Sequence, residues 1–112
     1  MINPHGGKLK NCLMDEAERQ KLLNDFDRLS SLTLDSDLIS DVENIATGVY
    51  SPLEGFMTSS DFESVLKNMR LADDLPWTIP IVIDIDRETA LKLKIGEKVA
   101  LRAEDGQPVA VL

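Results

Sequence analysis

The chain has 112 residues, which is the length of one small domain with a single modest core. Twenty acidic residues against twelve basic ones give a formal net charge of -8, which repels phosphate backbones and anionic lipid and so disfavours nucleic-acid and membrane partners. One cysteine cannot form an internal disulfide, and no apolar run reaches the length of a membrane span or a signal-peptide core, so we expect a cytoplasmic domain.

Two amphipathic helices are predicted over residues 15–29 and 35–48. Asp15 can cap the first helix, and either Asp35 or Ser36 can cap the second, because short polar side chains accept a hydrogen bond from the first helical turn. Each helix repeats its apolar residues at helical spacing and so presents one face to a core. These faces comprise Leu22, Leu23, Phe26 and Leu29 in the first helix and Leu38, Ile39, Val42, Ile45 and Ala46 in the second.

A third helix is predicted over residues 59–69, where Ser60 and Glu63 have the spacing of a capping box. Residues 77–86, WTIPIVIDID, are rich in β-branched side chains that alternate with others, which predicts a strand. Pro80 should lie at an edge or a bulge of that strand, because it has no N–H to donate. The apolar face of the third helix is expected to comprise Phe62, Val65, Leu66 and Met69.

The last part of the chain predicts a short helix and a β-hairpin. Asp86 can cap the helix and Gly96 can end it. Residues 97–112 then form two short strands around a turn, in which Asp105 and Gly106 supply the positive φ that a tight turn requires. The second strand is apolar and is followed by no turn, so we expect a sheet that is incomplete at this end.

The stretch ATGVYSPLEGFM, at residues 46–57, places apolar and aromatic side chains in a loop. Such a loop is either an internal plug of the domain's own core or a docking surface. Gly48 and Gly55 let the backbone turn while Tyr50, Leu53 and Phe56 point inward, which favours the plug. Phe56→Ala should lower the free energy of unfolding by about 3 kcal/mol or more for a plug, and by less than about 0.5 kcal/mol for a docking surface.

Few residues suit catalysis or metal binding. His5 is the only histidine and has no partner at metal-ligand spacing, so a turn or surface contact is expected for it. Cys12 lies in an apolar alternation and is expected to be a small buried side chain. Asp84 and Asp86 lie at the end of a predicted strand, where catalytic carboxylates often occur. Asp86 is already expected to cap a helix, which disfavours a catalytic role for the pair. The sequence therefore predicts no catalytic residue, no cofactor-binding residue and no metal ligand.

Three stretches resemble, in order and spacing, the N-terminal domain of ATP sulfurylase, also called sulfate adenylyltransferase. They are INPHGGKL, ATGVYSPLEGFM and MRLADDLPWTIPIVIDI. The resemblance covers nearly the whole chain, and the hairpin region is similar to domains of the PUA-like fold. It implies an α+β fold, in which several helices pack on a small PUA-like β-barrel that is incomplete at the C-terminus. The barrel strands are expected around Lys8, Leu32, Trp77, Val99 and Val109.

The resemblance also implies a function. The family converts ATP, with magnesium, and sulfate to adenosine 5′-phosphosulfate and pyrophosphate in sulfate assimilation and related sulfur metabolism. Its catalytic strings, Gln-x-Arg-Asn-Pro and His-x-x-His, belong to a second, α/β domain and do not occur here. Residues 1–112 are therefore expected to be a non-catalytic front domain, without a cofactor of its own. Its signature loop, structural or docking, comprises Gly48, Tyr50, Ser51, Pro52, Leu53, Gly55, Phe56 and Met57.

The expected partner is the catalytic domain of the same enzyme. The complete enzyme that contains both domains can be a homo-oligomer. The alternative is a stand-alone PUA-like module, for binding or scaffolding, that acts through a protein partner. PUA-like folds are often RNA binders, but RNA binding requires a basic surface. After residue 75, six acidic residues offset the five basic ones, which disfavours RNA. The basic residues are Arg87, Lys92, Lys94, Lys98 and Arg102.

Overall fold

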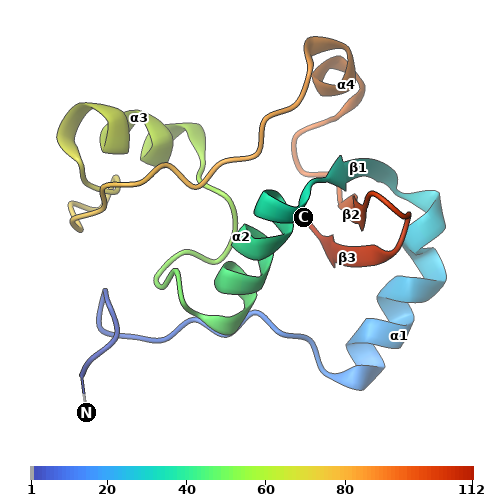
Figure 1. The fold of residues 1–112 in the computed structure, drawn as a ribbon, viewed down its shortest axis with the longest axis horizontal. Helices are drawn as coiled ribbons and strands as arrows, with labels where there is room; N and C mark the ends of the chain where they lie inside the picture. Colours follow the sequence, from blue (N-terminus) through green and yellow to red (C-terminus); the bar gives the residue numbers. More distant parts are fainter. Residues whose placement is uncertain (1) are drawn as a thin grey trace. The chain divides into compact units, whose positions relative to one another are not determined.

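The structure is a computed structural model that describes residues 2–112, drawn as a ribbon in Figure 1. The chain divides into two compact units, and each unit is built from two separate stretches. Unit 1 comprises Met1–Cys12 and Asn44–Ile83, and unit 2 comprises Leu13–Glu43 and Asp84–Leu112. The second division falls within helix α2 (Ser36–Thr47), so this helix contributes residues to both units.

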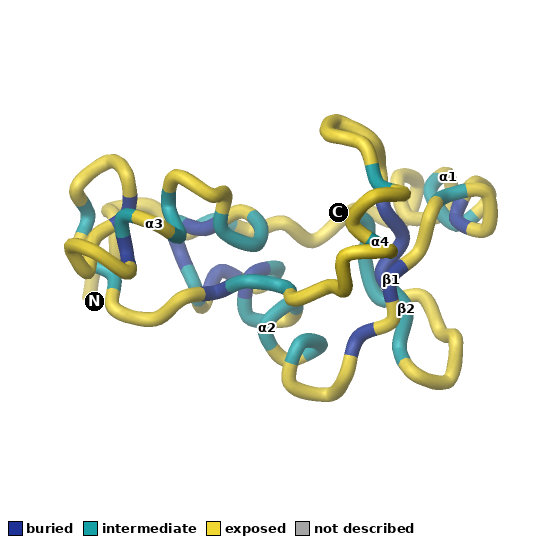
Figure 2. The backbone as a smooth tube through the Cα atoms, turned by 90° about the horizontal axis from the view of Figure 1, so that it is seen from above, coloured by how far each residue is buried: buried dark blue, intermediate teal, exposed yellow. Residues whose placement is uncertain are grey.

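Unit 2 contains a three-stranded sheet in the order β1-β2-β3. Strand β2 (Val99–Ala103) lies in the centre, parallel to β1 (Ser30–Leu34) and antiparallel to β3 (Pro108–Val111). The first three residues of β2 are all buried, as expected for a strand covered on both faces. In β1, Leu32 and Leu34 are buried while their neighbours are exposed. Figure 2 shows these buried positions along β1 and β2.

The helical part of unit 2 begins with α1 (Glu16–Asp25), which continues into the 3-10 turn η1 (Phe26–Arg28). The carboxylate of Asp15 accepts the N–H of Glu18 at 2.8 Å, so the predicted cap is confirmed. The ring of Phe26 is buried beneath Arg102, whose guanidinium carbon lies 4.5 Å from the ring centroid. This contact ties η1 to β2 by apolar burial and a cation–π interaction.

Two further predictions for unit 2 are confirmed at the level of single residues. Asp35 accepts the N–H of Leu38 at 2.8 Å and so caps α2. The hairpin forms with Gly106 in its turn at a φ of +87°, but the prediction that Asp105 also takes a positive φ is wrong, because among the described residues only Met69 and Asp74 do so besides glycines. Helix α4 (Arg87–Lys92) is capped by Asp86 as predicted, but it ends before Gly96, because Leu93 already has an extended backbone.

Unit 1 is built around the loop between α2 and α3 (Ser59–Asn68). Its N-terminal stretch is bonded to the end of α2, where the N–H of Cys12 donates to the carbonyl of Ala46 at 2.9 Å. Side chains from both helices and from the segments after them form one apolar core. The buried members of this core are Ile45, Leu53, Val65, Leu71 and Ile81, with Tyr50, Phe56, Met57, Leu75 and Trp77 packed against them.

The α+β class is confirmed, but the β-barrel is not. The sheet of residues 2–112 has three strands and is not closed, and the segments around Lys8 and Trp77 are not among its strands. The predicted strand over residues 77–86 is wrong, because its backbone bonds to loops instead of a ladder. The N–H of Trp77 donates to Met69, and the carbonyl of Ile81 accepts from Met57. One residue of the segment, Ile81, is nevertheless buried in the core of unit 1.

Two predictions about α3 are also wrong. Thr58, and not Ser60, is the cap, because its extended backbone lets its hydroxyl accept the N–H of Asp61. The predicted apolar face is buried only at Val65, with Phe62 half-buried. The remaining two side chains of that face are largely exposed, at 60% for Leu66 and 62% for Met69. Met69 has a left-handed backbone that ends the helix, which turns this residue away from the helical pattern.

Candidate functional site

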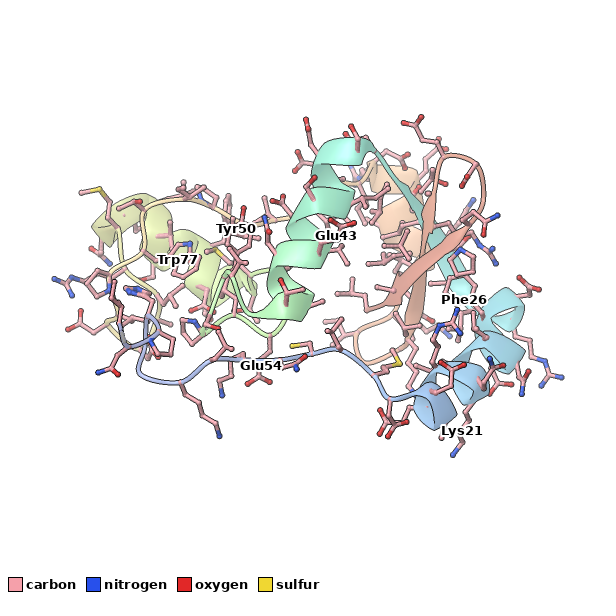
Figure 3. All side chains as sticks on the ribbon, turned by 60° about the horizontal axis from the view of Figure 1, so that its bottom comes forward. Lys21, Phe26, Glu43, Tyr50, Glu54 and Trp77 are labelled. Atoms are coloured by element: carbon pink, nitrogen blue, oxygen red, sulfur yellow. The ribbon has the colours of Figure 1, made fainter. Side chains whose placement is uncertain are left out.

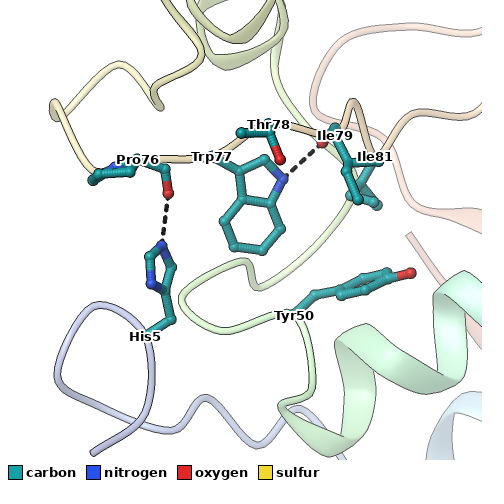
Figure 4. Close-up of a pocket in the computed structure, with 7 residues that line it drawn as sticks. All are labelled: His5, Tyr50, Pro76, Trp77, Thr78, Ile79 and Ile81. Carbon is teal, nitrogen blue, oxygen red and sulfur yellow. Dashed lines mark hydrogen bonds between the residues drawn. The ribbon is translucent and has the colours of Figure 1, made fainter.

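A pocket of about 270 Å³ opens on unit 1 (Figure 4). Its walls come from the N-terminal turn, the signature loop and the extended segment that follows α3. The lining residues are His5, Tyr50, Pro76, Trp77, Thr78, Ile79 and Ile81. We call it the aromatic pocket, because three of these side chains, those of His5, Tyr50 and Trp77, are aromatic.

The indole of Trp77 lies between the other two rings. The imidazole of His5 lies 5.7 Å from it between centroids, and the phenol ring of Tyr50 lies 6.3 Å away at 84°, an edge-to-face geometry. Figure 3 also shows the labelled tyrosine and tryptophan near each other. The indole N–H donates to the carbonyl of Ile79 at 2.7 Å, and Nε2 of the imidazole donates to the carbonyl of Pro76 at 2.7 Å. These bonds fix the two rings in place.

The turn that carries His5 is held against the signature loop. The N–H of Gly7 donates to the carbonyl of Pro4 at 2.9 Å. Gly6 has a φ of +79°, and a Cβ there would lie 3.2 Å from the ring of Pro52. Glycine therefore allows both the turn and its close approach to the loop.

The signature loop is deeply embedded in unit 1. Ser51 is 3% exposed and Leu53 is 7% exposed, while Pro52, Gly55, Phe56, Met57 and Tyr50 are half-buried. The peptide bond between Ser51 and Pro52 is cis. Gly48 is buried with a φ of +89°, and a Cβ there would lie 2.8 Å from the carbonyl oxygen of Lys10.

The Ser51 hydroxyl joins two distant parts of unit 1. It donates to the carbonyl of Gly48 at 2.7 Å and accepts the backbone N–H of Lys10 at 2.9 Å. The ammonium of the same lysine pairs with Glu54 at 2.9 Å. A buried hydroxyl with both a donor and an acceptor partner fixes the N-terminal stretch against the loop.

The sequence predicted part of this site. It singled out Tyr50 in the signature loop, and it expected a turn or surface contact for His5. It did not predict that these residues meet Trp77 in one pocket. A signal was available, because each of the three stretches that carry the family resemblance contains one of these rings.

Cys12 is exposed, which corrects the prediction that it is buried. Its Sγ lies 3.8 Å from the carbonyl oxygen of Glu54, to which it donates. The apolar alternation around this cysteine does not form a strand, so alternation there carries no information on burial.

The chemistry that the aromatic pocket offers is largely apolar. Among its seven lining residues there is no carboxylate, ammonium or guanidinium. Within residues 2–112, no group of three or more histidine, cysteine, aspartate or glutamate side chains has a geometry that could hold a metal ion. No helix in the same range is long and apolar enough to cross a membrane.

The carboxylates with shifted pKa values lie in unit 2. A hydrogen bond from the N–H of Thr89 lowers the pKa of Asp86 below its ordinary value, and a bond from the Gln20 side chain, aided by the charge of Arg19, lowers the pKa of Glu16. Asp86 is a helix cap, and Glu16 stands in the first turn of α1, so both shifts have structural causes.

Comparison with known proteins finds a matching domain family and similar enzymes that share one name. The profile of the PUA-like domain family matches residues 2–112. The sulfate adenylyltransferase of Thermococcus onnurineus is 52% identical over 102 residues, which are 91% of this chain and 26% of that protein. The sulfate adenylyltransferase of Halothermothrix orenii is 45% identical over 113 residues, which cover 100% of this chain and 30% of that protein. This chain thus spans less than a third of the relatives it matches.

A solved structure has the same fold. The hexameric APS kinase from Thiobacillus denitrificans is 37% identical, with a TM-score of 0.86. The match covers 100% of this chain and 22% of that protein.

Proposed function

Because the chain belongs to the PUA-like domain family, with sulfate adenylyltransferases among its relatives, we propose that it serves as the non-catalytic front domain of such an enzyme. The complete enzyme would convert ATP and sulfate to adenosine 5′-phosphosulfate and pyrophosphate. The remainder of that enzyme would carry the reacting groups and would be the principal partner of this domain. We place the enzyme in the cytoplasm.

The observation that carries this proposal is the asymmetry of coverage. The Halothermothrix orenii enzyme matches all of this chain, while the chain spans 30% of that enzyme. A domain that is matched throughout, but that forms a minor part of each relative, behaves as one module of a larger protein.

The charges of the chain support a non-catalytic role. Joining sulfate to a nucleotide phosphate brings two anions together, which requires cationic groups around the reacting atoms. Unit 1 has five acidic and four basic residues, and no lysine or arginine lines its aromatic pocket. Unit 2 has fifteen acidic and eight basic residues. Neither balance favours binding of ATP or sulfate.

The experiment is a titration of the 112-residue chain with ATP and with sulfate in a calorimeter, beside an assay of pyrophosphate release. We expect neither binding at micromolar concentrations nor turnover, whereas the complete Halothermothrix orenii enzyme should be active under the same conditions. Turnover by the isolated chain that survives removal of contaminating enzyme would overturn the non-catalytic role.

A chimera tests the positive half of the proposal. In it, this chain replaces the 113 matched residues of the Halothermothrix orenii enzyme. A chimera that releases pyrophosphate supports a role as front domain. A folded but inactive chimera would instead favour the alternative, a stand-alone PUA-like module that acts through a different protein partner.

We also propose that the complete enzyme is a homo-oligomer. The APS kinase from Thiobacillus denitrificans is hexameric, and its chain contains a region of this fold. The chimera and the parent Halothermothrix orenii enzyme can be compared by light scattering, and a monomeric mass for both would contradict this part of the proposal.

A further inference from the structure

We propose that the aromatic pocket receives one apolar or aromatic side chain from the catalytic part of the complete enzyme, and that it thereby anchors the front domain. This inference rests on the proposed function and adds the place of contact to it. Four observations carry it: the chemistry of the lining, the volume of the pocket, the order of its walls and the length of the relatives.

The lining selects an apolar ligand. A sulfate or phosphate group would meet no lysine or arginine among the seven lining residues, and a guanidinium or ammonium would meet no carboxylate. Burial of an unpaired charge is unfavourable in either case. The ring faces and the two isoleucine side chains instead offer contact to another ring or to a branched aliphatic side chain.

The volume of the pocket is sufficient for one large side chain. Pockets for ligands of drug or cofactor size measure roughly 300 to 1,000 Å³. The aromatic pocket measures about 270 Å³, which falls just below that range. It can hold one large side chain, which is how a buried anchor at the centre of a protein interface is usually accommodated.

Two side chains that line the aromatic pocket are held in place by hydrogen bonds within this domain. The indole of Trp77 and the imidazole of His5 each make a 2.7 Å hydrogen bond to the backbone. Fixed side chains lose little conformational entropy on binding, which raises affinity. Ile79 is 62% exposed and belongs to the lining, so an apolar side chain already lies where a partner could cover it.

The length of the similar enzymes indicates which part of the protein supplies the side chain that occupies the aromatic pocket. In the Halothermothrix orenii enzyme, the region that matches this chain is 30% of the protein, so most of that chain lies outside the matched region. Unit 1 is close to neutral, with five acidic and four basic residues, and the core of an interface is typically depleted of charge. The catalytic part of the same polypeptide is therefore the partner to which we assign the contact.

Trp77 allows a direct test, because it is the only tryptophan in the chain. We would label it with 5-fluorotryptophan and record its 19F resonance in the isolated chain and in the active chimera described above, assigning it in the chimera with Trp77→Phe. A soluble gadolinium chelate should broaden the resonance in the isolated chain. In the chimera we expect the broadening to fall by at least about threefold, because the partner side chain covers the indole.

A matched pair of variants shows whether the pocket causes the protection. Ile79→Arg places a charge at the pocket, and Leu91→Arg makes the same change at a side chain of unit 2 that is 76% exposed. Both residues are exposed, so both isolated variants should unfold at the midpoint of the unaltered chain. In the chimera, only Ile79→Arg should restore the broadening of the Trp77 resonance.

The outcomes separate the two proposals. An active chimera in which gadolinium broadens the Trp77 resonance as much as in the isolated chain overturns the pocket inference and leaves the front-domain role intact. Protection that persists in Ile79→Arg, or that is lost equally in Leu91→Arg, also overturns it. A chimera without pyrophosphate release, measured beside the active parent enzyme, counts against the proposed function.

Discussion

His5 and Pro76 are 71 positions apart in the chain, and Nε2 of the histidine donates to the carbonyl oxygen of the proline at 2.7 Å. The same imidazole packs beside the indole of Trp77. One exposed side chain thus attaches the N-terminal turn to the segment of unit 1 that follows α3. Because water competes at an exposed position, the bond should contribute no more than about 1 kcal/mol.

We therefore expect His5→Ala to lower the free energy of unfolding of unit 1 by about 1 kcal/mol, from the lost hydrogen bond and ring contact together. His5→Gln, whose amide can donate to the same carbonyl, should recover part of this loss. Urea denaturation followed by the fluorescence of Trp77 measures both. Equal losses for the two variants would show that the ring contact, and not the hydrogen bond, stabilises the turn.

Ser51→Ala should lower the free energy of unfolding more than His5→Ala does, because the hydroxyl of Ser51 is buried. Ser51→Ala removes the acceptor of the Lys10 N–H and one of two donors to the carbonyl of Gly48, which keeps the backbone N–H of residue 51 at 3.1 Å. A buried group left without a partner costs about 1 to 3 kcal/mol, so we expect a loss in that range. Ser40→Ala is the control, because its hydroxyl also donates to a backbone carbonyl but is exposed, and it should cost less than about 0.5 kcal/mol. Similar losses at both positions would contradict the importance of burial.

Comparing Gly48→Ala with Gly7→Ala distinguishes the cost of backbone strain from the cost of steric overlap. Both have a positive φ, +89° and +86°, so alanine at either should cost about 1 kcal/mol from the left-handed backbone. At Gly48 the added methyl would also lie 2.8 Å from the carbonyl oxygen of Lys10, whereas at Gly7 no atom of the described residues 2–112 lies within 4 Å of it. Overpacking adds about 1 to 3 kcal/mol, so Gly48→Ala should be clearly the more destabilising variant in thermal or urea unfolding. Equal losses would mean that the N-terminal stretch moves aside freely.

Leu53 and Phe56 test how the signature loop divides between core and surface. Leu53 is buried, and its replacement by alanine should cost about 2 to 5 kcal/mol. Phe56 is half-buried against the same core, so Phe56→Ala should cost less than a fully buried ring, about 1.5 to 2.5 kcal/mol. Urea denaturation gives both values. A loss below about 0.5 kcal/mol for Phe56→Ala would assign that ring to docking instead of the core.

The stability of helix α4 should depend on pH through its cap, Asp86. The N–H of Thr89 donates to its carboxylate at 2.7 Å and lowers the pKa of Asp86 below the ordinary value of 3.8. Since the folded state holds the proton less tightly than the unfolded state, the cap stabilises α4 above pH 3.8, and this contribution is lost as the pH falls through the lowered pKa. The amide resonance of Thr89 should therefore titrate with a midpoint below 3.8. Asp86→Asn should abolish this titration, and a midpoint above 3.8 would contradict the assigned shift.

Features fixed by neighbouring residues could be predicted from the sequence. The caps at Asp15, Asp35 and Asp86 and the turn at Gly106 are all as expected, because each depends on contacts within a few positions. The family resemblance drawn from three stretches is confirmed by the sulfate adenylyltransferases that match the chain. The exception is Thr58, where two further hydroxyl residues follow directly and the sequence could not distinguish which one begins the helix.

Features decided by distant contacts could not be predicted. Residues 77–86 have the alternation of a strand, but a strand also requires a partner, and the backbone here bonds to Met57 and Met69 instead. The aromatic pocket has the same character, since His5, Tyr50 and Trp77 belong to three segments that only the tertiary structure brings together. Local patterns describe the side-chain faces of a segment, whereas its backbone partners depend on the whole chain.

The parallel pairing of β1 with β2 has a consequence for synthesis on the ribosome. Ser30 of β1 pairs with Val99 of β2, 69 positions later, and the stretch Asn44–Ile83 of unit 1 lies between them. At a translation rate of about 5 to 20 residues per second, β1 waits roughly 3 to 14 s for its partner. During that interval the backbone of β1 lacks the strand with which it pairs, so the nascent chain presents an unpaired segment that carries Leu32 and Leu34. An unpaired apolar strand of this kind is prone to aggregation, so this interval is one in which a chaperone can protect the nascent chain.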